Sequence, residues 1–270
     1  MMKRSLMKVS LAAGLVTGAA TTAAADFPTF PVRRCAADAV LAGTVCLDRY
    51  EASVWRVPNP TTTNAILVRK IQLGIATRVD LMGGGATQLG TARDDYAPCA
   101  NNGQNCANDI YAVSLPSEIP SARITWFQAQ EACANAGKRL PTSAEWQVGA
   151  NGTPDPGPDN GTTDCNTASR GSASLTGARS ACVSARGAFD MVGNLTEWTA
   201  DWLPLSPICL SWGAFSNDDM CLAGASETND APGALLRGGT FNDGSLAGPL
   251  SVGDVPPSDT SPVIGFRCVR

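Results

Sequence analysis

The chain has 270 residues, a net charge of −4 and a pI near 4.9, and it contains no histidine. Its length allows one large domain or two small ones. Basic residues are scattered along it, which argues against a nucleic-acid partner. The lack of histidine excludes Ser-His-Asp and Cys-His catalysis and removes the commonest ligand of zinc and iron.

Residues 1–25 have the pattern of a secretory signal peptide. The basic residues Lys3 and Arg4 precede a short apolar run at 11–20, and an alanine-rich cleavage site ends before Asp26. The apolar run is too short to span a bilayer. We therefore expect a single exported domain of residues 26–270, secreted or periplasmic, with no membrane span.

The ten cysteines predict disulfides, because an even count behind a signal peptide implies an oxidising compartment. Spacing alone leaves many connectivities open. Proximity in sequence favours four pairs and leaves Cys133 for Cys268. The four are Cys35–Cys46, Cys99–Cys106, Cys165–Cys182 and Cys209–Cys221.

The region before residue 120 has weak signals. Residues 45–55 alternate in part and indicate a strand. The apolar run Ile66–Val68, with Ile71, also favours a strand. Residues 94–108 are polar, and Cys99 and Cys106 predict that this loop is stapled.

The clearest predicted helix runs from Trp126 to Ala136. Thr125 is its expected N-cap with Gln128 three residues on, and Gly137 stands where a C-terminal glycine belongs. Helical spacing places Cys133 on the inward face, which is consistent with pairing to a core strand.

A second, short helix is predicted from a capping box of Thr142 and Glu145, and it ends near Ala150. Trp146 and Val148 are its expected buried side chains.

Residues 151–185 are rich in Gly, Asn, Asp and Pro and have no regular period. An irregular stretch of this length needs a restraint such as a disulfide or bound ions. A group of oxygen-bearing side chains offers such an ion site, with solvated loop acids as the alternative. The group is Asp155, Asp159, Asn160 and Asp190.

A turn at Gly193–Asn194 leads into a strand that places Trp198, Ala200 and Trp202 on one side. We expect Trp198 and Trp202 to be buried, together with Trp126 and Trp146.

The last 34 residues consist of two strand pieces and the segment between them. The pieces are 237–241 and 265–270. Residues 242–264 hold four prolines, which predict a loop. A long loop framed by two strands is usually functional, and a plain surface excursion is the alternative. Arg237 and Arg267 either bind an anion or pair with acids inside the fold.

Taken together, these motifs resemble the formylglycine-generating enzyme (sulfatase-modifying factor) family, in the family's order and over most of the exported chain. The resemblance implies an α+β fold of the C-type lectin-like kind, with much ordered loop. It also implies the disulfide between Cys133 and Cys268. The motifs are Cys46–Ser53, Ile124–Trp126, Gly137–Trp146, Phe189–Trp202, Arg237–Phe241 and Gly265–Cys268.

The family's enzymes oxidise a substrate cysteine with a pair of cysteines that follows the Arg-Gly-Gly motif. Here residues 240–250 contain no cysteine. A serine cannot replace a copper-binding thiolate, so no copper is expected. The iron-dependent relatives need histidine ligands, which this chain lacks. The resemblance therefore carries over the fold and not the activity, and no catalytic residue is predicted.

The resemblance also implies a calcium site at the turn, with Asn194 and Glu197 as oxygen ligands. The alternative is a turn asparagine and a surface glutamate.

The tail further resembles the variable region of proteins diversified by retroelements, which share this fold and display substituted residues on it. Nine positions of the tail are the candidates for display and ligand binding. They are Asn242, Asp243, Ser245, Leu246, Ser251, Gly253, Asp254, Asp259 and Thr260.

The sequence thus predicts an exported recognition protein that binds a protein, peptide or glycan through its C-terminal loop. Two alternatives stay open: an enzyme of this family with a non-standard site, and a retroelement-diversified binder.

Overall fold

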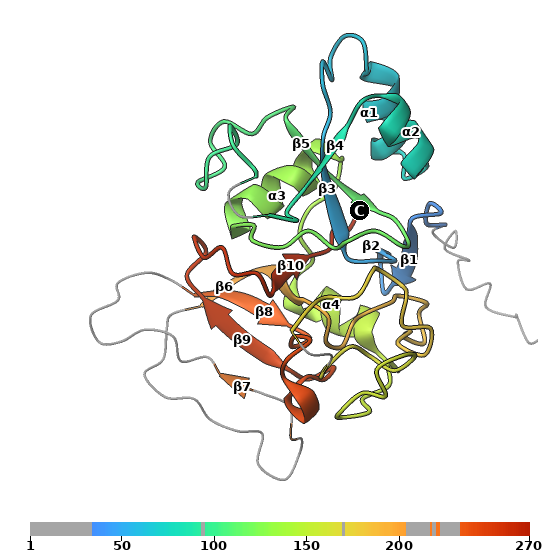
Figure 1. Ribbon diagram of the computed structural model, residues 1–270, viewed down its shortest axis with the longest axis vertical. Coiled ribbons are helices and arrows are strands. Elements are labelled where there is room, and N and C mark those ends of the chain that lie inside the picture. The colour runs from blue at the N-terminus through green and yellow to red at the C-terminus, as the bar shows by residue number, and fades with distance from the viewer. Residues whose placement is uncertain (1–33, 93–94, 169–170, 204–216, 218–219, 222–232) are drawn as a thin grey trace, which may run out of the picture. The chain divides into compact units, whose positions relative to one another are not determined.

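The computed structural model describes residues 34–92, 95–168, 171–203, 217, 220–221 and 233–270 (Figure 1). The chain divides into two units, Met1–Val32 and Arg33–Arg270, and every described residue belongs to the second. The predicted signal peptide and the pairing of Cys209 with Cys221 lie outside what is described.

The described elements are short, and loops connect them. The helices are α1 (Ala65–Gln72), α2 (Arg78–Gly83), α3 (Trp126–Asn135), α4 (Ser143–Ala150) and the 3-10 helix η1 (Gly244–Leu246). The strands are β1 (Ala39–Ala42), β2 (Val45–Asp48), β3 (Ala52–Arg56), β4 (Thr87–Leu89), β5 (Ile110–Ser114), β6 (Thr196–Leu203), β7 (Met220–Cys221), β8 (Gly233–Arg237), β9 (Val252–Val255) and β10 (Ile264–Phe266).

The strands form three sheets in the orders β1-β2, β4-β3-β5 and β10-β6-β8-β9-β7. In the largest sheet β6, β8 and β9 are antiparallel neighbours, and β10 runs parallel to β6 (Figure 1). Within the described residues no helix is long and apolar enough to cross a membrane.

Helix α3 begins where its capping box predicts. The Thr125 hydroxyl accepts a hydrogen bond from the Gln128 amide at 3.1 Å, and the Gln128 side chain accepts one from the Thr125 amide at 3.1 Å. Gly137 follows the helix at φ +70°, a conformation that favours glycine. The box of Thr142 and Glu145 starts α4 in the same way.

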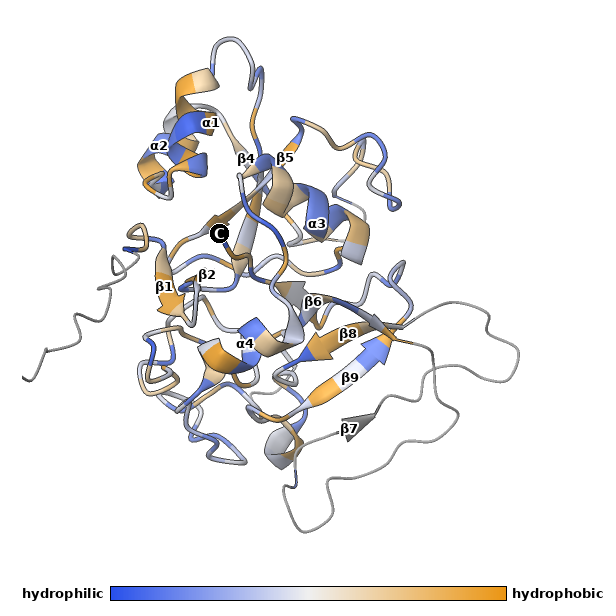
Figure 2. Ribbon diagram, turned by 180° about the vertical axis from the view of Figure 1, so that it is seen from behind, coloured by the Kyte–Doolittle hydropathy of each residue, from blue (hydrophilic) through white to orange (hydrophobic). Residues whose placement is uncertain are grey.

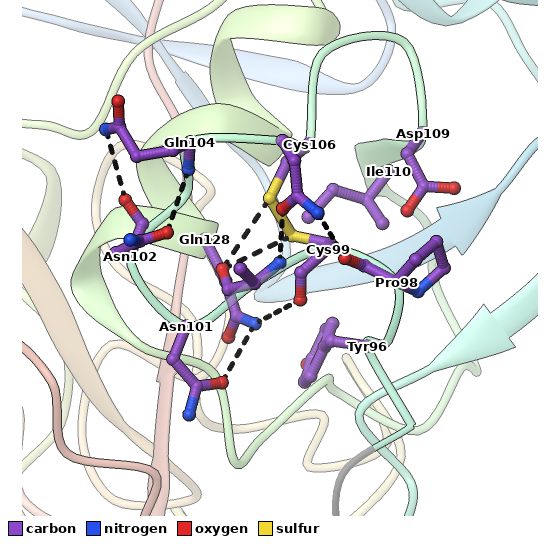
Figure 3. Close-up of a disulfide and its surroundings, with 12 residues drawn as sticks. Tyr96, Pro98, Cys99, Asn101, Asn102, Gln104, Cys106, Asp109, Ile110 and Gln128 are labelled. Carbon is purple, nitrogen blue, oxygen red and sulfur yellow. Dashed lines mark hydrogen bonds between the residues drawn. A yellow bond between two sulfur atoms is a disulfide. The ribbon is translucent and has the colours of Figure 1, made fainter.

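Four of the five expected disulfides are confirmed: Cys35–Cys46, Cys99–Cys106, Cys133–Cys268 and Cys165–Cys182. Figure 3 shows how the second one fastens its loop to α3. The side-chain amide of Gln128 donates to the Cys99 carbonyl at 3.1 Å, and the side-chain amide of Asn135 donates to the Cys106 carbonyl at 2.9 Å. The loop that carries Cys99 and Cys106 is therefore bonded to α3 near both ends of the helix.

The C-terminal tail lies against β2. Backbone hydrogen bonds join Cys46 and Arg270 in both directions at 3.0 and 2.9 Å, and Val269 pairs with Arg139 on its other side. With Cys268 bonded to Cys133 on α3, the last residues join the first strands to the central helices.

Several expectations were wrong. Residues 66–71 belong to α1, not to a strand, because Leu67 and Ile71 lie one helical turn apart and bury one face. Val148 is 37% exposed, and Trp202 is 40% exposed at the outer end of β6. The segment 242–264 is not all loop, since β9 lies between its prolines.

Candidate ligand-binding site

The centre of the fold is a buried ion pair between Arg267 and Glu197. The Arg267 guanidinium contacts both Glu197 oxygens at 2.6–2.9 Å, and the Trp146 indole donates to the same carboxylate at 2.7 Å. Arg267 also donates to the carbonyl oxygens of Asp48 and Phe189. Buried charges are tolerated when they are paired and hydrogen-bonded in this way. We refer to Arg267 and the groups bonded to it as the arginine hub.

Two further carboxyl groups lie buried near the hub. Burial raises the pKa of Asp190 to about 7, and burial together with neighbouring acids raises the pKa of Glu51 well above its usual value. Glu51 accepts hydrogen bonds from the Leu195 amide, at 3.0 Å, and from the Asn194 side chain. Glu51 thus fixes the Asn194 turn, across more than a hundred residues of sequence.

The Asn194 turn in turn fixes the start of the tail. The Gly193 amide donates to the Gly238 carbonyl at 3.0 Å, and the Phe241 amide donates to the Asn194 carbonyl at 2.9 Å. Gly193 has φ +71°, and a Cβ there would lie 2.2 Å from the Asn166 carbonyl oxygen. Only glycine fits this close approach.

Arg237 anchors the next part of the tail from the end of β8. Its guanidinium lies 5.0 Å from the centre of the Trp146 ring and donates to the Pro249 carbonyl at 3.3 Å and to the Gln147 side chain. The two arginines were expected to bind an anion or to pair with acids. Arg267 pairs with Glu197, and the contacts described for Arg237 include an aromatic ring, a side-chain amide and the loop backbone.

Beyond these anchors lies a pocket of about 200 Å³. Hydroxyl-bearing residues, two aspartates and small or aliphatic residues line it, and several of them belong to β8 and β9. Its residues are Thr196, Leu236, Gly239, Thr240, Asp243, Ser251, Val252, Gly253, Asp254 and Val255. Its hydroxyl and backbone groups can form hydrogen bonds with a ligand group that enters the pocket.

The structure brings together some of the predicted ligand-binding residues. Asp243, Ser251 and Asp254 line the pocket, as does Gly253. A second group lies at or near the exposed turn η1 and does not line the pocket: Asn242, Ser245 and Leu246. Asp259 and Thr260 are half-buried in the loop between β9 and β10.

Strand register separates Asp254 from the other polar side chains. Asp254 pairs with Leu235, while Gly253 pairs with Leu236 in the main core. Side chains alternate along a strand, so the Asp254 carboxyl group points to the face opposite that core. It is 6% exposed, neither oxygen has a hydrogen-bond partner within the described chain, and burial raises its pKa.

Asp243 organises the turn itself. Its carboxylate accepts a hydrogen bond from the Thr240 amide at 2.7 Å, and the Thr240 hydroxyl accepts one from the Asn242 amide at 3.2 Å. Thr240 and Thr196 are pocket residues that the sequence analysis missed. Thr240 directly follows the Arg-Gly-Gly motif, and this position is the sequence feature that could have marked it as a pocket residue.

The two predicted calcium ligands already have protein partners. Arg267 and Trp146 occupy the Glu197 oxygens, and the Asn194 side-chain oxygen accepts from Asn166 at 2.9 Å and from the Ser174 amide at 2.7 Å. A guanidinium in contact with the carboxylate opposes a second cation. The pair does not fit a calcium ion in this arrangement, and calcium binding here stays a prediction.

The loop acids are likewise engaged separately. Asp159 accepts from the amides of Thr167 and Ala168, and Asp190 accepts from the Gly177 amide at 2.7 Å. Among the described residues, no three His, Cys, Asp or Glu side chains form a group that could hold a metal.

The chain belongs to the family described as "Sulfatase-modifying factor enzyme 1-like domain", whose profile matches residues 98–270. This membership, with the mixed helices and sheets and the four disulfides, confirms the predicted α+β fold of the sulfatase-modifying-factor type.

The chain is also similar to individual proteins. It is 36% identical over 89 residues to the serine/threonine-protein kinase Pkn1 of Chlamydia trachomatis serovar L2, a match that covers 31% of this chain and only 14% of the kinase. Among solved structures it is similar to the Major Tropism Determinant P3c variant, at 20% identity over 85% of this chain and 51% of that chain, with a TM-score of 0.45. It is also similar to the Treponema denticola variable protein 1, at 15% identity over 87% of this chain and 92% of that chain, with a TM-score of 0.43.

Proposed function

We propose that this protein is an exported, non-catalytic recognition protein that binds a protein, peptide or glycan through residues 239–255. The pocket beside β9 and the exposed turn η1 together form its binding surface.

One observation carries the proposal: among the described residues, none of those that line the pocket after the Arg-Gly-Gly motif is a cysteine. Within residues 237–270 the one cysteine is Cys268, which is bonded to Cys133 on α3. Cys221 on β7 pairs with Gly253 of the pocket, and its predicted disulfide partner, Cys209, lies outside the described residues. Thiolate chemistry needs a free, ionised sulfur. Hydroxyl and carboxylate groups on a fixed wall support hydrogen-bonded recognition instead.

Export is supported by the four disulfides, which form and persist in extracellular and periplasmic compartments. They also hold the loops in place, so that a binding surface made of loop has little conformational entropy to lose.

Peptide and glycan arrays probed with the purified, oxidised chain would test the proposal. Leu246→Arg changes the exposed turn, and Ser251→Val removes a pocket hydroxyl. Leu175→Arg is the matched control, because Leu175 is 45% exposed in a different loop and Leu246 is 49% exposed. We expect the first two variants to lose the bound spots and the control to keep them. Binding that neither variant alters would contradict this location.

The exposed side chains at η1 favour a second candidate, a retroelement-diversified binder. Asn242, Ser245 and Leu246 project from a turn whose backbone is fixed by Asp243. A template copy of the coding sequence for 237–270, differing only at adenines and lying beside a reverse-transcriptase gene, would establish it. Genomic sequence without such a copy would rule it out.

A further inference from the structure

Exposed aliphatic side chains are concentrated in the short stretch 66–82. Elsewhere in the described chain, large exposed hydrophobic residues are more scattered, which is ordinary for a protein surface. A group of them is not ordinary and usually marks an interaction surface. The five, which we call the α1–α2 patch, are Ile66 (77% exposed), Leu73 (44%), Ile75 (53%), Val79 (81%) and Met82 (58%).

The helical period explains why these residues face outward. Helix α1 buries Leu67 and Ile71 in a core cluster with Trp55 and Tyr111. At 100° per residue, Ile66 and Leu73 fall on the opposite face. Helix α2 buries only Leu81, and Val79 lies about half a turn away from it.

The two helices contact each other through an ion pair and near Leu67. Lys70 on α1 and Asp80 on α2 form an ion pair at 2.5 Å. A Cβ placed on Gly84, just after α2, would lie 2.5 Å from the Leu67 side chain. Figure 2 shows strongly hydrophobic and strongly hydrophilic residues interspersed along both helices.

The charge of this surface is opposite to that of the whole protein. Residues 65–83 contain three cations (Arg69, Lys70 and Arg78) and one anion (Asp80), a net charge of +2, whereas the chain carries −4. Glu118, from the loop after β5, pairs with Arg78 at 2.8 Å and lowers the local sum to +1. Arg69 is exposed between Ile66 and Leu73 on the outward face of α1.

These features select one kind of partner. A second copy of the chain would bring Arg69 and its equivalents together across a two-fold contact, and like charges oppose that pairing. None of the five patch residues is aromatic, whereas protein interfaces draw much of their binding energy from Trp and Tyr. A bilayer needs no shape complementarity, and it accepts projecting aliphatic groups while its anionic headgroups attract lysine and arginine.

We propose that the α1–α2 patch docks the exported protein on an anionic phospholipid membrane. The aliphatic side chains enter the boundary between headgroups and acyl chains, and Arg69 meets the phosphates. The α1–α2 patch contains none of the residues that line the C-terminal pocket or form the turn η1, so membrane attachment and ligand binding are separate properties of the molecule.

Co-sedimentation of the exported chain, from Asp26 onward, with vesicles tests the proposal. Vesicles of equal parts phosphatidylglycerol and phosphatidylcholine are compared with vesicles of phosphatidylcholine alone. We expect binding to the anionic vesicles, weakened by salt, and at least about tenfold weaker partition for Ile66→Ser/Val79→Ser, because two exposed aliphatic groups no longer leave water. Leu175→Ser, at a site of 45% exposure in another loop, should bind as the wild type does.

The variant Arg69→Glu tests the contribution of the positive charge while the apolar side chains stay in place. It should weaken binding to the anionic vesicles and leave the unfolding transition unchanged. Three results would overturn the proposal: no binding to anionic vesicles at low salt, equal binding to neutral ones, or full binding by the double serine variant. A dimer that the double variant abolishes would likewise overturn it, in favour of self-association.

Discussion

The arginine hub and the pocket segment 238–255 are neighbours in the fold and differ in almost every physical respect. In the hub, Arg267 and Glu197 are buried and fully bonded, and their partners come from distant parts of the chain. The pocket segment consists of glycine turns, a short 3-10 helix and β9, with exposed side chains at η1 and a buried carboxyl group, Asp254, that has no hydrogen-bond partner in the described chain. The fold thus concentrates its bonding in the hub and exposes polar side chains at η1 beside it.

The largest expected effect comes from removing the hub's cation. Arg267→Met leaves Glu197 buried without its partner and near the buried acids Glu51 and Asp190, so we expect a loss of about 5 kcal/mol in the free energy of unfolding or failure to fold. Arg69→Met, at an exposed site, should change it by less than about 0.5 kcal/mol. Urea unfolding followed by tryptophan fluorescence measures both. Similar stability of the two variants would show that the hub does not hold the fold.

The next largest effect concerns the disulfide Cys133–Cys268, which joins α3 to the C-terminal tail. Cys133→Ala/Cys268→Ala opens a loop of sequence separation 135, and Cys99→Ala/Cys106→Ala opens one of 7. In the chain-entropy account the losses are about 5 and about 2 kcal/mol. Urea midpoints of the two double variants give the comparison, and a larger loss for the short loop would contradict the order.

Two glycines of the pocket segment have the same backbone conformation but different surroundings. Gly239 (φ +75°) and Gly244 (φ +56°) are both left-handed, but a Cβ at Gly239 would lie 2.7 Å from the Ala247 Cα, whereas none of the neighbours lies within 4 Å of one at Gly244. Gly244→Ala should cost about 1 kcal/mol, and Gly239→Ala about 1–3 kcal/mol more. Thermal unfolding distinguishes them. Equal costs would mean that the loop moves freely away from Gly239.

The smallest effect is a dependence on acid pH at α4, which lies beside the hub. The Arg139 guanidinium, together with the Thr142 amide and hydroxyl, lowers the pKa of Glu145 to about 2. A folded pKa below the unfolded value of 4.5 means that the stabilisation is present above pH 4.5 and is lost as the pH falls toward 2. The pair is partly exposed, so we expect less than about 1 kcal/mol. Unfolding of Glu145→Gln should show a correspondingly flatter dependence between these values.

Local signals in the sequence predicted the central elements well. The capping boxes at Thr125 and Thr142 each need only residues three positions apart, and a helix that positions Cys133 inward has few partners to choose from. Local signals failed for α1, where Ile66, Val68 and Ile71 have strand propensity but the 67–71 spacing buried a helical face.

The site was harder to predict because its geometry depends on long-range contacts. Glu51 accepts a hydrogen bond from Asn194 across more than a hundred residues of sequence. Glu197, a predicted calcium ligand, pairs with Arg267, which is 70 residues away in sequence. The segment 242–264 was the predicted site, and four of its predicted residues line the pocket: Asp243, Ser251, Gly253 and Asp254. The structure divides this segment into pocket residues and the turn η1, and this division depends on β9. The prolines on both sides of β9 favoured a loop in the sequence and hid the strand.

Incubation of the oxidised protein with copper and a peptide that carries the sulfatase cysteine motif tests the central claim most directly. A tail without a free thiol should leave the peptide cysteine unchanged in the mass spectrum, even over long incubation. Conversion of that cysteine to formylglycine would contradict the account and return the pocket to enzymatic chemistry.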